Sequence, residues 1–148
     1  MRVVLQRVKH AKVSVEGRTV GEIGEGFCLL VGVAVGDVES DAVQLAEKIA
    51  HLRVFEDEEG KMNRSLVDVE GAILAVSQFT LYADCSRGRR PSFTDAMEPQ
   101  EANRLYERFM EHLKAKNIEV EKGIFQANMD VELCNQGPVT MILESKKG

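Results

Sequence analysis

The pattern of hydrophobic positions predicts several strands along the chain and helices in two stretches. Residues 1–15 are rich in valine, and residues 13–15 alternate apolar and polar, as a half-buried strand does. After a glycine turn, we expect residues 19–23 to return as a strand. Residues 27–35 are almost wholly apolar, which predicts a central strand covered on both faces. Gly32 in this run indicates a close approach of backbone or ligand, or a bulge.

Two stretches have apolar residues at helical spacing. Asp37 or Ser40 is suited to cap a helix that runs to about Leu52. Pro99 opens a second helix, which runs to about Lys116. The apolar face of the first helix consists of Ala42, Leu45, Ala46, Ile49 and Leu52, and that of the second consists of Ala102, Leu105, Phe109 and Leu113. The charged residues of the second helix are expected to be solvated: Glu101, Arg104, Glu107, Arg108 and Glu111.

The remaining segments predict strands and turns. Residues 56–60 form an acidic turn that is suited either to bind a cation or, more commonly, to be a solvated hairpin tip. Further strands are expected at residues 53–55, 73–76, 118–125, 129–134 and 139–143. A strand-rich order with two separate helices predicts an α+β fold. We expect a single domain over residues 1–148, with a mainly antiparallel, barrel-like sheet and two principal helices.

Composition narrows the class of protein. With 148 residues, 44% of them hydrophobic and 29% charged, the chain is typical of one globular domain with a sizeable core. The formal net charge is −5, so the chain as a whole does not favour nucleic-acid binding. A protein that contacts only the end of a nucleic acid is still compatible with that charge.

The three cysteines do not indicate a disulfide or a metal site. Cys28, Cys85 and Cys134 are odd in number, and neither a CxxC pair nor a Cys/His cluster occurs. We therefore expect no metal and no cofactor. The N-terminus has no signal-peptide pattern, and no apolar run approaches the ~18 residues of a membrane span. These features predict a cytoplasmic protein that does not enter a membrane.

The segment Ser77-Gln78-Phe79-Thr80 follows a buried strand and allows two interpretations. In the simpler one, the strand ends there, its hydroxyl groups bond locally, and Phe79 lies in the core. In the other, backbone N–H groups form a pocket that stabilises an oxyanion, beside the Thr80 hydroxyl. A nucleophilic threonine needs a nearby base, and no histidine is close in sequence, so side-chain nucleophilic catalysis is poorly supported.

Residues 85–92 contain the one basic patch, Arg87, Arg89 and Arg90. The segment is either a solvated loop or a flexible arm that contacts phosphates, for which arginine supplies bidentate donors. Its place directly after the candidate site suits the second interpretation.

Two motifs together resemble the signatures of the D-aminoacyl-tRNA deacylases, the D-tyrosyl-tRNA deacylase family. They are Ser77-Gln78-Phe79-Thr80 and Gly137-Pro138-Val139-Thr140, and the resemblance covers the whole chain from Leu5-Gln6-Arg7-Val8 onward. It implies hydrolysis of the ester between a D-amino acid and tRNA, with glycyl-tRNA as a further substrate. It also implies a homodimer that binds the 3′ end of an aminoacylated tRNA in sites at the subunit interface.

The resemblance also assigns roles to residues. Residues 77–80 would form the catalytic segment, where the terminal ribose 2′-hydroxyl helps to activate water. Gly137-Pro138 would have a cis peptide bond, enter the partner's site and exclude L-amino acids, while Arg7 steadies that segment. Phe125 and Met129 match positions that line the adenine pocket. The chain departs from the pattern at Gln136, where aspartate is common.

Two other classes of function stay open from the residues alone. One is an esterase that uses Thr80 or Ser77 as a nucleophile, which a trapped acyl-enzyme would reveal. The other is a non-catalytic module that binds the tRNA 3′ end and leaves the ester intact.

Overall fold

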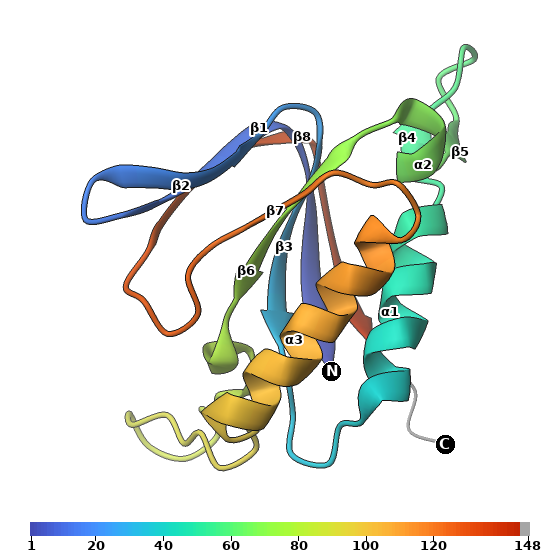
Figure 1. Cartoon of the computed structure of the whole chain (residues 1–148). Helices are drawn as coiled ribbons and strands as arrows, with labels where there is room; N and C mark the ends of the chain where they lie inside the picture. Colours follow the sequence, from blue (N-terminus) through green and yellow to red (C-terminus); the bar gives the residue numbers. More distant parts are fainter. Residues whose placement is uncertain (146–148) are drawn as a thin grey trace.

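The computed structural model describes residues 1–145. The long first strand is its central element, and three further strands pair with it directly (Figure 1). In chain order the elements are β1 (Arg2–Val15), β2 (Arg18–Ile23), β3 (Gly26–Gly32), α1 (Glu39–His51), β4 (Phe55–Glu56), β5 (Met62–Arg64), α2 (Leu66–Val69), β6 (Ala72–Ser77), the 3₁₀ turn η1 (Phe79–Tyr82), α3 (Pro99–Lys114), β7 (Val120–Lys122) and β8 (Asp130–Glu144).

The main sheet has the strand order β2-β1-β3-β6-β7, with β8 on the opposite edge of β1. The first half of β1 pairs with β3 and its second half with β2, both antiparallel, and β8 follows it antiparallel along the other edge. The predicted α+β class and mainly antiparallel, barrel-like sheet are confirmed. The β3–β6 and β6–β7 pairs are parallel, however, which the sequence analysis did not predict. They arise because a helix connects the two strands of each pair, and such a crossover returns the chain in the same direction.

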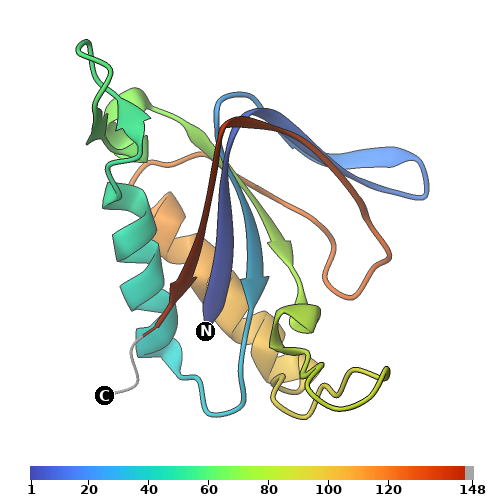
Figure 2. The same cartoon turned by 180° about the vertical axis from the view of Figure 1, so that it is seen from behind.

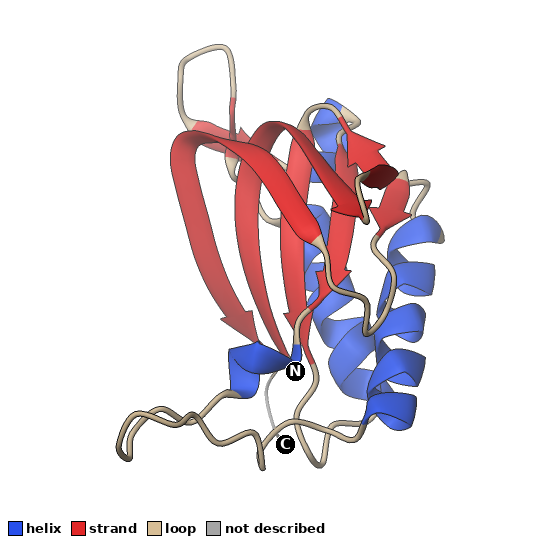
Figure 3. Ribbon diagram, turned by 90° about the vertical axis from the view of Figure 1, so that its left-hand side faces the viewer, coloured by secondary structure: helices blue, strands red, loops and turns tan. Residues whose placement is uncertain are grey.

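The two predicted helices are confirmed, and they lie side by side on one face of the sheet (Figures 2 and 3). Their apolar faces bury Leu45, Ile49, Leu105, Phe109 and Leu113 completely or nearly so. From the sheet, alternate residues of β1 and β3 meet them, including Val3, Leu5, Leu29 and Val31. This period-two burial fixes the register of the strands and therefore the position at which each strand ends. No helix in residues 1–145 is long and apolar enough to span a membrane.

The expected cap of α1 is wrong. The residue before the helix is Val38, whose N–H donates to the Asp41 carboxylate at 2.8 Å. Asp37 is instead buried, where its carboxylate accepts from Ala34 N and lies 2.7 Å from the Met1 amino group. This carboxylate compensates the charge of the buried ammonium group, because an unpaired charge there would be costly.

Several predicted strand limits also differ from the structure. The central strand ends at Gly32 rather than at residue 35. The strands expected at residues 129–134 and 139–143 are one strand, β8, with irregular pairing opposite residues 6–11. The strand expected at residues 118–125 is confined to β7, because a turn follows it, closed by a bond from Ala127 N to Ile124 O.

The short elements α2 and η1 were not predicted. Ser65 and Asp68 cap α2 reciprocally: each side chain accepts from the backbone N–H of the other residue, at 3.1 and 2.9 Å. The sequence Ser-x-x-Asp signals such a start, so α2 was predictable. The acidic turn at residues 56–60 is the tip of the β4–β5 hairpin, as expected, and its Asp57 carboxylate accepts from two backbone N–H groups.

Candidate functional site

A cavity of about 660 Å³ opens where the parallel strands β3 and β6 end. The carboxyl ends of parallel strands are where sheets of this kind commonly place ligand sites. Six residues predicted from the sequence line it together: Ser77, Gln78, Phe79, Thr80, Phe125 and Met129. The lining also includes Phe93 and the residues at and just before the start of α3, which are Met97, Glu98, Pro99 and Ala102.

Backbone contacts position the segment 77–80. Gln78 N donates to Val31 O at 2.8 Å, and the chain then turns into η1. A Cβ atom on Gly32 would lie 3.0 Å from Leu81 Cβ and 3.2 Å from Gln78 O, so a glycine is needed for the turn to close against β3. The predicted close backbone approach at Gly32 is therefore confirmed.

The turn leaves polar groups available at the cavity. Its first internal bond is donated by Leu81 N to Gln78 O at 3.3 Å, so the N–H groups of Phe79 and Thr80 have no acceptor within the turn. The Thr80 hydroxyl accepts from Gln78 Nε2 at 2.9 Å. Phe79 is 57% exposed and meets Phe93 edge to face at 5.1 Å. The interpretation that placed Phe79 in the core is therefore wrong.

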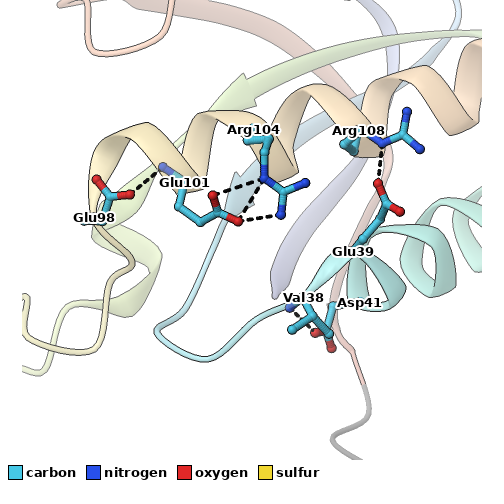
Figure 4. A network of polar contacts seen from close by, with 7 residues as sticks. All are labelled: Val38, Glu39, Asp41, Glu98, Glu101, Arg104 and Arg108. Atoms are coloured by element: carbon cyan, nitrogen blue, oxygen red, sulfur yellow. Dashed lines mark hydrogen bonds and ion pairs between the residues drawn. The ribbon is translucent and has the colours of Figure 1, made fainter.

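The cavity lining supplies no ready base for a nucleophile. Among the described residues that line it, the only carboxylate is that of Glu98, and there is no histidine. Glu98 caps α3, where its carboxylate accepts from Gln100 N at 3.0 Å and Glu101 N at 2.7 Å (Figure 4). No group of three or more His, Cys, Asp or Glu residues within residues 1–145 is arranged to hold a metal ion.

Charged pairs on the outer surface lie within α3 and between α3 and α1. Arg104 binds Glu101 one turn earlier, and Arg108 reaches across to Glu39 at the start of α1 (Figure 4). Hydrogen bonding to Arg108 lowers the pKa of the Glu39 carboxyl. These side chains are partly exposed, as predicted for solvated charges.

The aromatic wall of the cavity is fixed through α3. The ring of Phe125 packs against Tyr106 at 6.3 Å between centroids, and Tyr106 Oη donates to Ala75 O at 2.7 Å. Burial raises the pKa of Tyr106, so its hydroxyl keeps the proton that this bond requires. Beside it, Gly123 lacks the Cβ that would lie 2.5 Å from Met129 Sδ, which leaves room for Met129 to reach the cavity.

The second predicted motif lies at the edge strand β8, opposite Arg7. The Gly137-Pro138 peptide bond is cis, as the resemblance implies, and both residues are exposed. Arg7 is only 4% exposed and donates to Gln136 O, to Val54 O and to the Glu56 carboxylate. The expected contact between Arg7 and the segment is thus present.

Asn135 ties the two sides of the motif together. Its Oδ1 accepts from Val139 N at 3.1 Å, and its Nδ2 donates to Thr140 Oγ1 at 3.0 Å. Sequence reasoning gave Asn135 no role, although asparagine is common where a side chain must mimic a backbone turn.

Within one chain the two motifs are far apart. Ser77 pairs with Val31 of β3, which in turn pairs with Val3 of β1. Gly137 lies opposite β1 near Arg7, four residues further along that strand. Four residues along the strand and three strand spacings across the sheet give a separation on the order of 20 Å. Gly137 and Pro138 accordingly do not line the cavity.

The basic loop forms a second hollow of about 450 Å³. It is lined by Asp84, Ser86, Arg87, Arg90, Ser92 and Thr94. Arg89, the third predicted arginine, is not part of the lining. The structure therefore separates the three arginines that the sequence presented as one patch.

Similarity to known proteins extends over the whole chain. The family model described as D-Tyr-tRNA(Tyr) deacylase matches residues 4–144. A D-aminoacyl-tRNA deacylase of Anoxybacillus flavithermus is 62% identical over 146 residues, which are 99% of this chain and 100% of the relative. The enzyme of the same name from Thermus aquaticus is 58% identical over 147 residues, 99% of this chain and 97% of the relative.

Two solved structures have the same fold. The c-Myc DNA unwinding element binding protein is 40% identical with a TM-score of 0.92, over 99% of this chain and 100% of that one. A probable eukaryotic D-amino acid tRNA deacylase is 18% identical with a TM-score of 0.83, over 97% and 98% of the two chains. At that identity the second match speaks for the fold alone.

Proposed function

The chain belongs to the D-Tyr-tRNA(Tyr) deacylase family, and from this membership we propose that it hydrolyses the ester bond of D-aminoacyl-tRNA in the cytoplasm. One observation of the structure carries the proposal. Residues 77–80 and residues 125 and 129, almost fifty positions apart in sequence, line one cavity that is apolar on one side and offers polar groups on the other. The products are free tRNA and a D-amino acid, so the activity is a form of translation quality control.

The cavity is suited to the terminal adenosine of an aminoacylated tRNA. Phe125 and Met129 offer an apolar surface to the adenine, because aromatic and thioether side chains pack well against a flat ring. The aminoacyl ester then lies toward residues 77–80, where the N–H groups of Phe79 and Thr80 point to the carbonyl oxygen that becomes negative during attack. Such preorganised donors are often the largest catalytic contribution in acyl transfer.

This mechanism does not need a protein nucleophile. An aminoacyl ester is already activated, so positioning and oxyanion stabilisation account for much of the lowering of the barrier. The attacking water is activated with help from the ribose 2′-hydroxyl of the substrate. The absence of a histidine from the described lining, and the use of Glu98 as a helix cap, favour this reading over an esterase that uses Thr80 or Ser77.

We also propose that the site is completed by a second copy of the chain. Gly137 and Pro138 are exposed on edge strand β8, on the order of 20 Å from the cavity of their own chain. On the same strand Ile142 is 70% exposed, a large apolar group that a partner subunit would cover. In a homodimer, the Gly137-Pro138 segment of one subunit enters the cavity of the other.

Chirality is then selected by exclusion. The backbone carbonyls of Gly137 and Pro138 would occupy the space that an L-side chain needs, whereas a D-side chain points away. A hydrogen atom meets no such obstacle, so glycyl-tRNA is a further substrate. Arg7 and Asn135 hold the segment in place through the bonds described above.

The test compares matched D-tyrosyl-, L-tyrosyl- and glycyl-tRNA with the purified protein. We expect release of D-tyrosine and glycine and retention of the L-ester, together with a dimeric mass in solution. Equal rates on the D- and L-esters would overturn the exclusion mechanism. Binding of charged tRNA with every ester left intact would instead support a non-catalytic module for the tRNA 3′ end.

A further inference from the structure

We propose that the hollow formed by Asp84, Ser86, Arg87, Arg90, Ser92 and Thr94 is a phosphate pocket for the phosphodiester that precedes the terminal adenosine. The inference rests on the proposed function and adds to it a second subsite. This subsite receives the RNA backbone, while the larger cavity receives the nucleoside and its amino acid.

The lining has the chemistry of a phosphate site. Two guanidinium groups offer bidentate donors. The hydroxyl groups of Ser92 and Thr94 bond to each other at 3.4 Å, which leaves one hydroxyl hydrogen of the pair for a ligand. The single carboxylate, that of Asp84, accepts from Ser86 N at 2.9 Å, and bonding to Ser86 lowers its pKa. Asp84 is therefore occupied in shaping the turn, and two positive charges against one negative leave the hollow basic.

The two arginines of the hollow differ from the surface arginines that pair with a carboxylate, although Arg18, Arg53 and Arg89 likewise form no ion pair within residues 1–145. Arg2, Arg104 and Arg108 each pair with a carboxylate. Neither Arg87 nor Arg90 forms an ion pair anywhere in residues 1–145. Guanidinium groups that are gathered in one hollow without an internal partner remain available to an anionic ligand.

The hollow and the larger cavity share one wall. Asp84 and Ser92 pair through two backbone hydrogen bonds of 2.7 and 2.9 Å, which close the neck of the loop. Ser92 and Thr94 line the hollow, whereas Phe93 between them lines the cavity and contacts the ring of Phe79. The Ser92 and Thr94 hydroxyl groups lie 3.4 Å apart on the side of the hollow, and Phe93 lines the cavity, so the backbone of residues 92–94 runs between the two spaces.

This shared wall identifies which phosphate is bound. The phosphodiester that precedes the terminal adenosine is attached to the same ribose that carries the amino acid. When that nucleoside fills the cavity, the RNA chain leaves it beside Phe93, next to Arg87 and Arg90 (the loop is yellow in Figure 1, beside the start of α3). A phosphate contact carries no base information, so the pocket fits the 3′ end of any tRNA.

Two small substrates isolate this phosphate. One is the D-tyrosyl ester of adenosine, which has no phosphate, and the other is the same ester on the dinucleotide CpA, which retains one. We expect the variant Arg87→Ala/Arg90→Ala to raise KM for the CpA ester about 10- to 100-fold, with kcat unchanged, because charged hydrogen bonds are lost. Its kcat/KM for the adenosine ester should match that of the unaltered protein.

Two further variants serve as comparisons. Arg18→Ala removes one positive charge from the exposed start of β2 and should leave both substrates unaffected. Arg89→Ala, the same change beside the hollow, should raise KM for CpA less than about threefold, through screened long-range attraction only. Salt should weaken binding of the CpA ester less in the double variant than in the unaltered protein, since one phosphate contact is gone.

Each outcome decides one point. An equal loss on both small substrates would overturn the pocket, because the arginines would then act on the cavity itself. A loss seen only with full-length tRNA would also overturn it, by placing the contact elsewhere on the RNA. If the unaltered protein cleaves neither small ester nor D-tyrosyl-tRNA, the proposed function fails, which is distinguishable from failure of the phosphate pocket alone.

Discussion

The two motif regions of this protein differ in whether their polar groups have hydrogen-bond partners within the chain. At the Arg7 edge, a buried guanidinium has acceptors in Val54, Glu56 and Gln136, all from its own chain. At the cavity, the N–H groups of Phe79 and Thr80 have no acceptor within their turn. The first arrangement fixes a shape, and the second leaves donors for a ligand. Bonding within the chain thus distinguishes polar groups that hold a local shape from those that remain available to a ligand.

The largest effect is expected from a substitution that disrupts the edge region around Arg7. Replacing Arg7 by alanine leaves two backbone carbonyls without their donor in a buried place, which should lower the free energy of unfolding by about 3 kcal/mol. Urea denaturation of the purified variant measures this loss. Arg7→Lys is the matched control, because it keeps the positive charge but lacks the planar guanidinium group with its several donors. This variant should be more stable than Arg7→Ala and less stable than the unaltered protein. A variant as stable as the unaltered protein would show that the edge is not held by Arg7.

Gly137→Ala should have the next largest effect, because it strains the exposed backbone of β8 at this position without removing a bond. Gly137 has φ of +125°, and an added Cβ would lie 2.9 Å from Val139 Cγ2 and 3.1 Å from Arg7 Nη2. We expect a stability cost of about 2 kcal/mol. We also expect a rise in hydrolysis of L-tyrosyl-tRNA relative to D-tyrosyl-tRNA. Gly24→Ala, where a Cβ would meet nothing within 4 Å, controls for the loss of a glycine. If the Gly137-Pro138 segment is displaced and chiral selectivity is unchanged, the segment is not part of the site.

Thr80→Ala sharpens the comparison on the cavity side. If backbone N–H groups stabilise the oxyanion, the variant should fold and keep kcat within about tenfold of the unaltered value. The hydroxyl group accepts only from Gln78 Nε2 at an exposed position, so stability should change little. Single-turnover kinetics on D-tyrosyl-tRNA separates chemistry from release. A loss of several orders of magnitude with binding intact would revive the nucleophile hypothesis.

The smallest effect is expected for Arg108→Ala, a substitution at a residue that belongs to neither motif region. Its ion pair with Glu39 joins α3 to α1 through partly exposed side chains, and such pairs contribute little. The unfolding midpoint should fall by less than for Arg7→Ala or Gly137→Ala, and this decrease should become smaller as salt is added. A loss of stability as large as that of Arg7→Ala would mean that a partly exposed ion pair stabilises this protein as much as the buried contacts of Arg7 do.

The fold was predictable where the pattern was local. Alternation in β1 and helical spacing in α1 and α3 gave these elements nearly to their limits. The parallel pairing of β3 with β6 was also within reach, because a helix lies between them in the chain. The continuity of β8 was not, because Gly137 and Pro138 look like a break in sequence, and only the bonds of Asn135 and Arg7 carry the strand through them.

The site was predictable in its membership and less so in its geometry. Residues 77–80, 125 and 129 were named from motifs, and they share one cavity. Neither Phe93 nor the start of α3 was foreseen as part of the lining, because contacts across the fold leave no local pattern. Likewise, three neighbouring arginines gave no sign that Arg89 would be excluded from the hollow.

The paired backbone of Asp84 and Ser92 divides the loop into two parts with different tolerance to changes in length. Residues 85–91 lie beyond the neck, where an added or deleted residue alters only a surface excursion, and loop closure depends weakly on length. Between the neck and the bridge of Ala96 with Ala34, a single insertion would either change the position of Phe93 or disrupt the turn closed by the bond from Ala96 N to Phe93 O. Among homologues, insertions and deletions should therefore be found before residue 92 and be absent from residues 92 to 96.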